Sequence, residues 1–222
     1  GSPESDSQRV PDASHNPWDE AERHISAVDP AMALLIARNS PCRLKPDANV
    51  FVGILEAIVS QQLSGKAAAT IFGRYQALFP DGISPEAVLD LPVETMRGIG
   101  FSRAKAAYCH DLARHVVEGR LGLDHLDRLD DEEVVAELTA VKGIGRWTAE
   151  MILIFHLNRA DVLPVDDLGI REGFRRTYTM GERPGKDEMV RIAEAWRPWR
   201  TVGSWYLWRA LDESPFPGKE TS

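Results

Sequence analysis

The chain has 222 residues, of which 43% are hydrophobic and 27% charged, a composition typical of a globular protein with one sizeable core or two small lobes. No apolar run approaches the roughly 20 residues of a membrane helix and no leader sequence opens the chain, so we expect a cytoplasmic protein without a membrane. The first two residues, Gly1 and Ser2, resemble the remnant of a cleaved expression tag. Two cysteines, Cys42 and Cys109, are too few for a disulfide framework or a thiolate metal site, and we expect no catalytic metal.

The charge of the chain is unevenly distributed. The formal net charge is −8, which by itself argues against nucleic acid as a partner. Residues 1–29 carry seven acids and two arginines, a net charge of −5, whereas residues 171–209 carry nine basic and five acidic side chains, a net charge of +4. The distribution therefore leaves room for a basic face on an acidic protein.

The hydrophobic pattern is helical along most of the chain. Residues 1–16 are polar and without periodicity, so we expect a disordered tail, followed by one domain over 17–222. No alternating run predicts a strand, apart from 161–165, which Pro164 interrupts. We expect an all-α fold of two helical lobes with a cleft between them, residues 45–130 in one lobe and the N-terminal helices with 131–213 in the other. The predicted helices span about 48–62, 66–79, 102–118, 130–139, 145–157, 187–196 and 201–211.

Two glycines join a polar-faced helix to an apolar one at Gly143-Ile144-Gly145. Glycines permit positive φ and close approach, so the amides that open the second helix, together with Arg146, can bind a phosphate. For a lone Gly-x-Gly, an ordinary inter-helix turn with Gly143 as its C-cap is the favoured interpretation, and the surrounding sequence shifts the balance toward an anion site. The segment thus predicts a helical hairpin with a candidate anion site.

A pair of acids follows about twenty residues later. Pro164 and Val165 lead into Asp166 and Asp167 at the start of a further helix, where a carboxylate can cap the amides and is favoured as an anion. Asp166 is the expected cap and Asp167 the expected first-turn residue. The residues alone allow either acid a chemical role.

This order of hairpin, spacer, proline and aspartate resembles the helix-hairpin-helix, Gly/Pro, Asp superfamily, and most closely its bacterial 3-methyladenine DNA glycosylase II branch. The resemblance runs from about residue 48 to residue 212 and includes 143–149 and 196–200. It implies a monofunctional glycosylase of base excision repair that hydrolyses the N-glycosidic bond of alkylated bases, such as 3-methyladenine and 7-methylguanine, flipped out of double-stranded DNA. We expect a monomer in a bacterial cytoplasm, without the N-terminal β-rich domain of larger members.

The resemblance also assigns roles near the carboxylate. It gives catalysis to Asp167 and a base pocket to Trp147 and Trp208, an aromatic setting that suits cationic methylated purines. Met151 stands where the best-studied members carry tyrosine, and we expect Tyr206 or another aromatic side chain to compensate for the lost ring. These assignments leave the preferred base undetermined.

One position separates two types of glycosylase. Bifunctional members carry a lysine that forms a Schiff base two residues beyond the second hairpin glycine, and Trp147 occupies that position here. The residue therefore predicts an enzyme that leaves an abasic site without cutting the strand.

Two further features follow from the family pattern. Gln62, with Leu63 as the apolar alternative, aligns with the wedge that fills the stack when a base is flipped. No cofactor is required, although the family implies a structural Na or K ion held by backbone carbonyls of the hairpin, which fall on Thr139, Val141 and Ile144.

Two competing hypotheses remain at the level of sequence. A non-catalytic helix-hairpin-helix module would grip DNA with Asp166 and Asp167 as caps only. A bifunctional glycosylase with lyase activity would contradict the interpretation of Trp147.

Overall fold

The computed structural model describes residues 15–211, so nearly all of the tail expected to be disordered lies outside the described residues. Within that range every regular element is a helix and none is a strand, which confirms the all-α prediction. The elements are α1 (Asp19–Val28), α2 (Pro30–Asn39), α3 (Val50–Ser60), α4 (Gly65–Gln76), α5 (Pro85–Asp90), α6 (Val93–Gly98), α7 (Arg103–Val117), η1 (Leu123–Arg128), α8 (Asp131–Thr139), α9 (Arg146–Phe155), α10 (Leu168–Thr177), α11 (Lys186–Ala193), η2 (Glu194–Trp196) and α12 (Arg200–Arg209).

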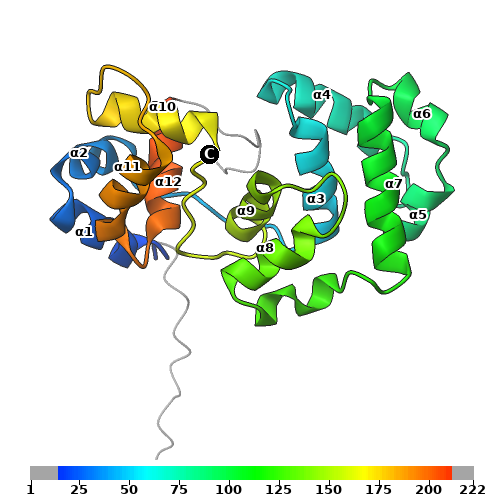
Figure 1. The fold of residues 1–222 in the computed structure, drawn as a ribbon, viewed down its shortest axis with the longest axis horizontal. Helices are drawn as coiled ribbons and strands as arrows, with labels where there is room; N and C mark the ends of the chain where they lie inside the picture. The colour runs from blue at the N-terminus through cyan, green and yellow to red at the C-terminus, as the bar shows by residue number, and fades with distance from the viewer. Residues whose placement is uncertain (1–14, 212–222) are drawn as a thin grey trace, which may run out of the picture.

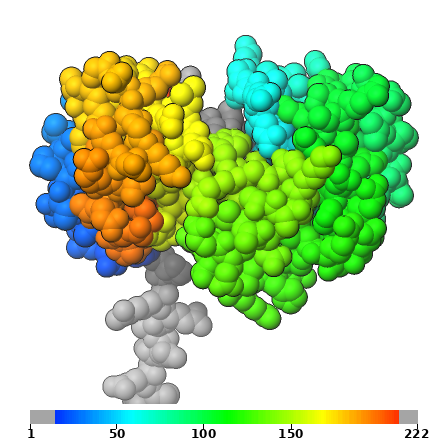
Figure 2. Space-filling model, in the orientation of Figure 1, coloured from blue at the N-terminus to red at the C-terminus, as the bar shows by residue number. Residues whose placement is uncertain are grey.

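The helices form two groups (Figure 1). In one, α3 packs on α4, α7 and α9, while α5 and α6 pack on α7 and α8 packs on α9. In the other, α1 and α2 pack on α12, and α10 packs on α2 and α12. The space-filling view shows the surface hollowed between α10 and α4, at the top of the molecule (Figure 2).

The boundary between the lobes differs from the one expected at residue 131. Helices α8 and α9 belong with α3, and the chain crosses to the other lobe only after α9, through residues 156–167. The physical reason lies in α9, where every residue from 148 to 155 is buried. A helix that is buried on all sides needs neighbours all round, and α3 provides one of them. The hairpin between α8 and α9 therefore belongs to the α3 lobe.

Short polar residues set the starts of the helices that the pattern predicted. Asn49, Ser64, Ser102 and Asp130 each cap a helix, their side-chain oxygens accepting from the amide three residues on. The short helices α5 and α6 were not predicted, because six residues are too few for a hydrophobic period to stand out.

Two buried carboxylates fasten the N-terminal helices to the C-terminal ones. Glu22 of α1 accepts from the hydroxyl of Tyr206 over 2.9 Å. Asp29, before α2, accepts from the hydroxyl of Tyr178 and, over 3.0 Å, from the indole of Trp196. Buried acids need such donors to offset lost hydration, so these bonds fix the lobe that carries α10 and α12.

Candidate active site

Asp167 is the N-cap of α10. Its backbone is extended, with φ −76° and ψ 123°, and its Oδ1 accepts from the amide of Ile170. The expectation that Asp166 is the cap was therefore wrong by one residue. The chain turns where the amide of Asp167 donates to the carbonyl of Pro164, so the helix begins at Leu168 and leaves Asp166 exposed.

Three N–H groups converge on the Asp167 carboxylate. Oδ2 accepts from the indole of Trp147 over 2.7 Å, and Oδ1 accepts from the indole of Trp208 over 3.0 Å and the Ile170 amide over 2.9 Å. The side chain is only 7% exposed. Because all three partners can only donate, the site suits an acceptor with two oxygens, and it fixes both of them in place.

Gly169 is a residue of this site that sequence reasoning missed. A Cβ at this position would lie 3.0 Å from Oδ1 of Asp167 and 3.2 Å from Cδ1 of Trp208. A side chain this close would displace the Asp167 carboxylate or the Trp208 indole. The absence of a side chain at Gly169 therefore provides the space in which these two groups form their hydrogen bond. Its place two residues after the acid was the only signal in the sequence.

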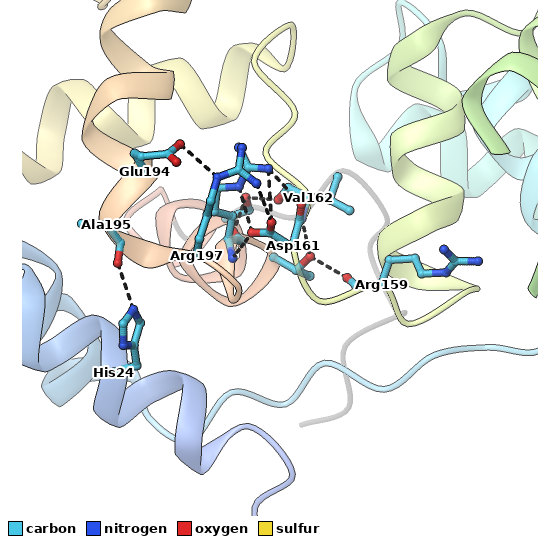
Figure 3. Close-up of polar contacts among 10 residues, drawn as sticks. His24, Arg159, Asp161, Val162, Glu194, Ala195 and Arg197 are labelled. Carbon is cyan, nitrogen blue, oxygen red and sulfur yellow. Dashed lines mark hydrogen bonds and ion pairs between the residues drawn. The ribbon is translucent and has the colours of Figure 1, made fainter. Parts of the chain in front are cut away.

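The segment that leads to Asp167 is held by a polar network (Figure 3). Asp161 accepts from Arg197 over 2.9 Å and from Arg200 over 2.8 Å. The Thr201 hydroxyl donates to the carbonyl of Arg159 and accepts from the amide of Val162. These contacts attach the crossing segment to the start of α12, the helix that also carries Trp208. The segment that leads to Asp167 and the indole of Trp208 that donates to it are therefore held by the same helix.

The hairpin turn lies between α8 and α9. Gly143 has φ +92°, and a Cβ there would lie 2.3 Å from Cγ of Tyr108, whose ring covers the glycine from α7. Gly145 has φ −95° and caps α9 without a side-chain bond. Of the two hairpin glycines only Gly143 uses the left-handed region, while Gly145 leaves the first amides of α9 uncovered by a side chain, as an anion site requires. Ile144 between them is buried.

Arg146 at the start of α9 is engaged in ion pairs. Its guanidinium donates two bonds to Glu132 of α8, and its Nε lies 3.9 Å from Glu150. Glu150 is 4% exposed, and burial raises its pKa to about 7 in spite of the nearby guanidinium. The expected phosphate contact by Arg146 therefore requires exchange of a carboxylate for a phosphate.

The expected base-pocket residues divide into two groups. Trp147 and Trp208 meet at Asp167, and Trp208 also stacks on Phe155 with ring centroids 5.7 Å apart. Met151, one turn after Trp147, is fully buried beside them on α9. The expectation for Tyr206 was wrong: its ring is fully buried and its hydroxyl is bonded to Glu22, because it faces α1 rather than Asp167.

The expected wedge residues lie in the turn between α3 and α4. Gln62 and Leu63 are both exposed there, Leu63 by 38%, and Gln62 has φ +60°, in the left-handed region. Both side chains are exposed on the lobe that also carries the hairpin, as a side chain that inserts into DNA must be. Their assignment as the wedge stays a prediction.

The alkali-ion expectation rests on backbone carbonyls. That of Val141 already accepts from the Ile144 amide, which leaves one lone pair for an ion, and the adjacent Gly143 carbonyl accepts from a side chain. No cluster of three or more His, Cys, Asp or Glu side chains suited to a metal occurs in residues 15–211. The carbonyl site for Na or K at Thr139, Val141 and Ile144 stays a prediction.

None of the described helices has the length and apolar character needed to cross a membrane.

An all-helical fold with a glycine hairpin and a buried, indole-bound aspartate is typical of the class of helix-hairpin-helix DNA repair proteins. The model of the HhH-GPD superfamily base excision DNA repair proteins matches residues 55–198, and the chain belongs to this family.

Curated relatives agree with this assignment. DNA-3-methyladenine glycosylase 1 of Schizosaccharomyces pombe is 37% identical over 195 residues, which cover 85% of this chain and 86% of the relative. DNA-3-methyladenine glycosylase 2 of Escherichia coli is 27% identical over 82% of this chain and 64% of its own length.

Solved structures agree as well. A 3-methyladenine DNA glycosylase of Schizosaccharomyces pombe in complex with abasic DNA superposes with a TM-score of 0.81 at 35% identity, over 89% of this chain and 98% of the other. A DNA-3-methyladenine glycosidase of Bacillus halodurans has a TM-score of 0.76 at 36% identity, over 90% and 94%.

Proposed function

We propose that this protein is a monofunctional DNA glycosylase that hydrolyses the N-glycosidic bond of alkylated bases in double-stranded DNA and leaves an abasic site. The single observation that carries the chemistry is the Asp167 carboxylate, held by an amide of its own lobe and by indoles from α9 and α12. A helix cap alone needs only the Ile170 amide, so the two indole bonds support a role beyond capping. The relatives named as 3-methyladenine glycosylases support the substrate class.

Cleavage of the bond builds positive charge on the sugar. A carboxylate whose oxygens are fixed beside C1′ stabilises that charge without having to reorganise, and it also orients the attacking water. Trp147 is half-buried, so part of its indole is accessible to an entering base. Methylation at N3 or N7 makes a purine cationic, and an aromatic face attracts it.

The partner is DNA, bound as a duplex and read by base flipping. The amides at the start of α9, together with Arg146, take a backbone phosphate, and the protein acts as a monomer. The bacterial cytoplasm and nucleoid stay predictions.

The experiment compares Asp167→Asn with Asp166→Asn on duplexes that each carry one methylated base. Base release is scored as alkali-dependent strand cleavage. Asp167→Asn should lose about 100-fold or more in rate with DNA binding retained, as expected when a group that stabilises the transition-state charge is removed. Asp166→Asn removes an equal charge one residue away and should stay near the wild type. Equal release by the wild type and Asp167→Asn would refute the catalytic assignment of Asp167, and no release by the wild type would leave the non-catalytic DNA-binding module.

A further inference from the structure

The end of α3 is connected to the hairpin through one side chain. Gln61, the last residue before the exposed turn, donates from Nε2 to the carbonyl of Gly143 and to the hydroxyl of Thr148, both over 3.1 Å. Gly143 is in the hairpin, and Thr148 is in the first turn of α9, directly after Trp147. A single amide thus joins the turn that carries Gln62 and Leu63 to the element that binds Asp167.

Lys105 holds the same turn from the other side. Its ammonium donates to the carbonyls of Val59 and Gln61, over 2.8 and 2.6 Å. These carbonyls lie at the end of α3, where the helix leaves acceptors without partners and its dipole is negative. Burial lowers the pKa of Lys105, yet a cation suits this place. Tyr108, one turn later on α7, covers Gly143, so α7 braces both the turn and the hairpin.

The backbone between these contacts is strained. Gln62 has φ +60° although it is not glycine, a conformation that costs about 1 kcal/mol or more. A chain keeps such a conformation only when its surroundings impose it. The amide of Leu63 closes the turn on the carbonyl of Ser60, and the bonds to the carbonyl and the side chain of Gln61 hold the residue immediately before Gln62.

We propose that Gln61 and Lys105 are positioning residues that hold the Gln62–Leu63 turn in register with the hairpin and with Trp147. The inserting side chain then enters the stack where the flipped nucleotide leaves it. This inference rests on the proposed function, because it concerns the flipping step that precedes base release. Neither residue touches the reacting atoms.

The test compares two substrates that differ in the cost of flipping. One is a duplex in which the methylated base is stacked and paired, and the other is the same strand single-stranded, where no stack has to be filled. The variants are Gln61→Ala and Lys105→Met. Gln76→Ala, at the exposed end of α4, is the matched control for loss of a glutamine at a helix end. Rates are measured in single turnovers at saturating enzyme.

A register role predicts a selective loss. Gln61→Ala and Lys105→Met should release the base from the duplex about 10-fold or more slowly than the wild type, and from the single strand within about twofold of it, since flipping costs least when the base is unpaired. Fluorescence of 2-aminopurine next to the lesion should report less unstacking. Lys105→Arg should recover part of the duplex rate.

Two outcomes contradict the proposal. An equal loss of rate on both substrates would indicate general damage to the site. An unchanged rate on both would show that the contacts of Gln61 and Lys105 do not contribute to base release. A loss of fold would be visible in thermal unfolding, and Thr148→Val, which removes one of the two Gln61 bonds at constant shape, then takes the place of Gln61→Ala with the same expected selectivity. Failure of the wild type on both substrates would instead refute the proposed function.

Discussion

The indole nitrogen of Trp147 donates to Oδ2 of Asp167 over 2.7 Å, and this bond joins the two lobes. Trp147 belongs to α9, which packs with α3, whereas Asp167 caps α10 in the other lobe. The residue that replaces the lysine of bifunctional enzymes therefore also orients the carboxylate.

Trp147→Phe tests this bond. Phenylalanine keeps an aromatic face for the base but has no N–H, so Oδ2 loses its donor. A hydrogen bond to a charged group contributes about 1.5–3 kcal/mol, so the rate of base release should fall about 10- to 100-fold. The measurement is the single-turnover rate at saturating enzyme. Trp199→Phe is the matched control, and an unchanged rate in Trp147→Phe would show that the bond does not orient the acid.

The same aspartate should matter for stability. Asparagine caps a helix about as well as aspartate, but its NH2 group would face the indole N–H of Trp147, so Asp167→Asn should unfold at a moderately lower temperature than the wild type. Asp167→Ala loses the cap and leaves the indoles of Trp147 and Trp208 without an acceptor. The lost cap and the two unpaired donors together should lower the free energy of unfolding by about 2–4 kcal/mol. Thermal and urea unfolding measure the difference. Equal stability of the two variants would contradict a structural contribution of the carboxylate.

The two hairpin glycines should respond differently to alanine. At Gly143 the positive φ and the Tyr108 ring both oppose a methyl group, so Gly143→Ala should destabilise the fold and weaken DNA binding. Gly145 has no atom within 4 Å of a built Cβ. Gly145→Ala should therefore fold normally and weaken DNA binding only, because its methyl would stand among the amides offered to the phosphate. Unfolding curves and salt-dependent DNA titrations separate the two effects, and undiminished binding by Gly145→Ala would refute the phosphate site.

Glu150 should make stability depend on pH. Burial raises its pKa from 4.5 to about 7, so the folded state holds this proton more tightly than the unfolded state. The stabilisation is complete below about pH 4.5 and is lost as pH rises to about 7. Glu150→Gln mimics the protonated form, so it should match the wild type at pH 4.5 and exceed it at pH 8 by up to about 3 kcal/mol, at 1.36 kcal/mol per pH unit. Urea unfolding at both pH values is the measurement. Parallel curves for the two proteins would contradict the raised pKa.

The absence of a lysine at position 147 predicts the reaction type. Borohydride should trap no covalent adduct between the wild-type protein and a duplex from which it releases bases, because Trp147 occupies the position of the lysine that would form the Schiff base. The abasic strand should break only after alkali. A trapped adduct would establish the bifunctional alternative.

The sequence by itself determined the all-α class, most of the long helices, the hairpin and the acid pair. These features depend on local physics: a hydrophobic period, breakers such as Pro and Gly, and caps at fixed offsets. The family resemblance then selected Asp167 over Asp166, which local chemistry could not do, since either acid can cap a helix.

Only the tertiary structure decided which side chains meet. Asp167 proved to be the cap as well as the bound carboxylate, because the turn at Pro164 starts α10 one residue later than expected. Tyr206 left the pocket because α12 turns it toward Glu22. The lobe boundary moved because α9 is buried on all sides and packs on α3. The bonds of Gln61 and Lys105 join residues more than forty positions apart. Such contacts depend on how whole helices pack, and no periodicity within one helix encodes its partner on another.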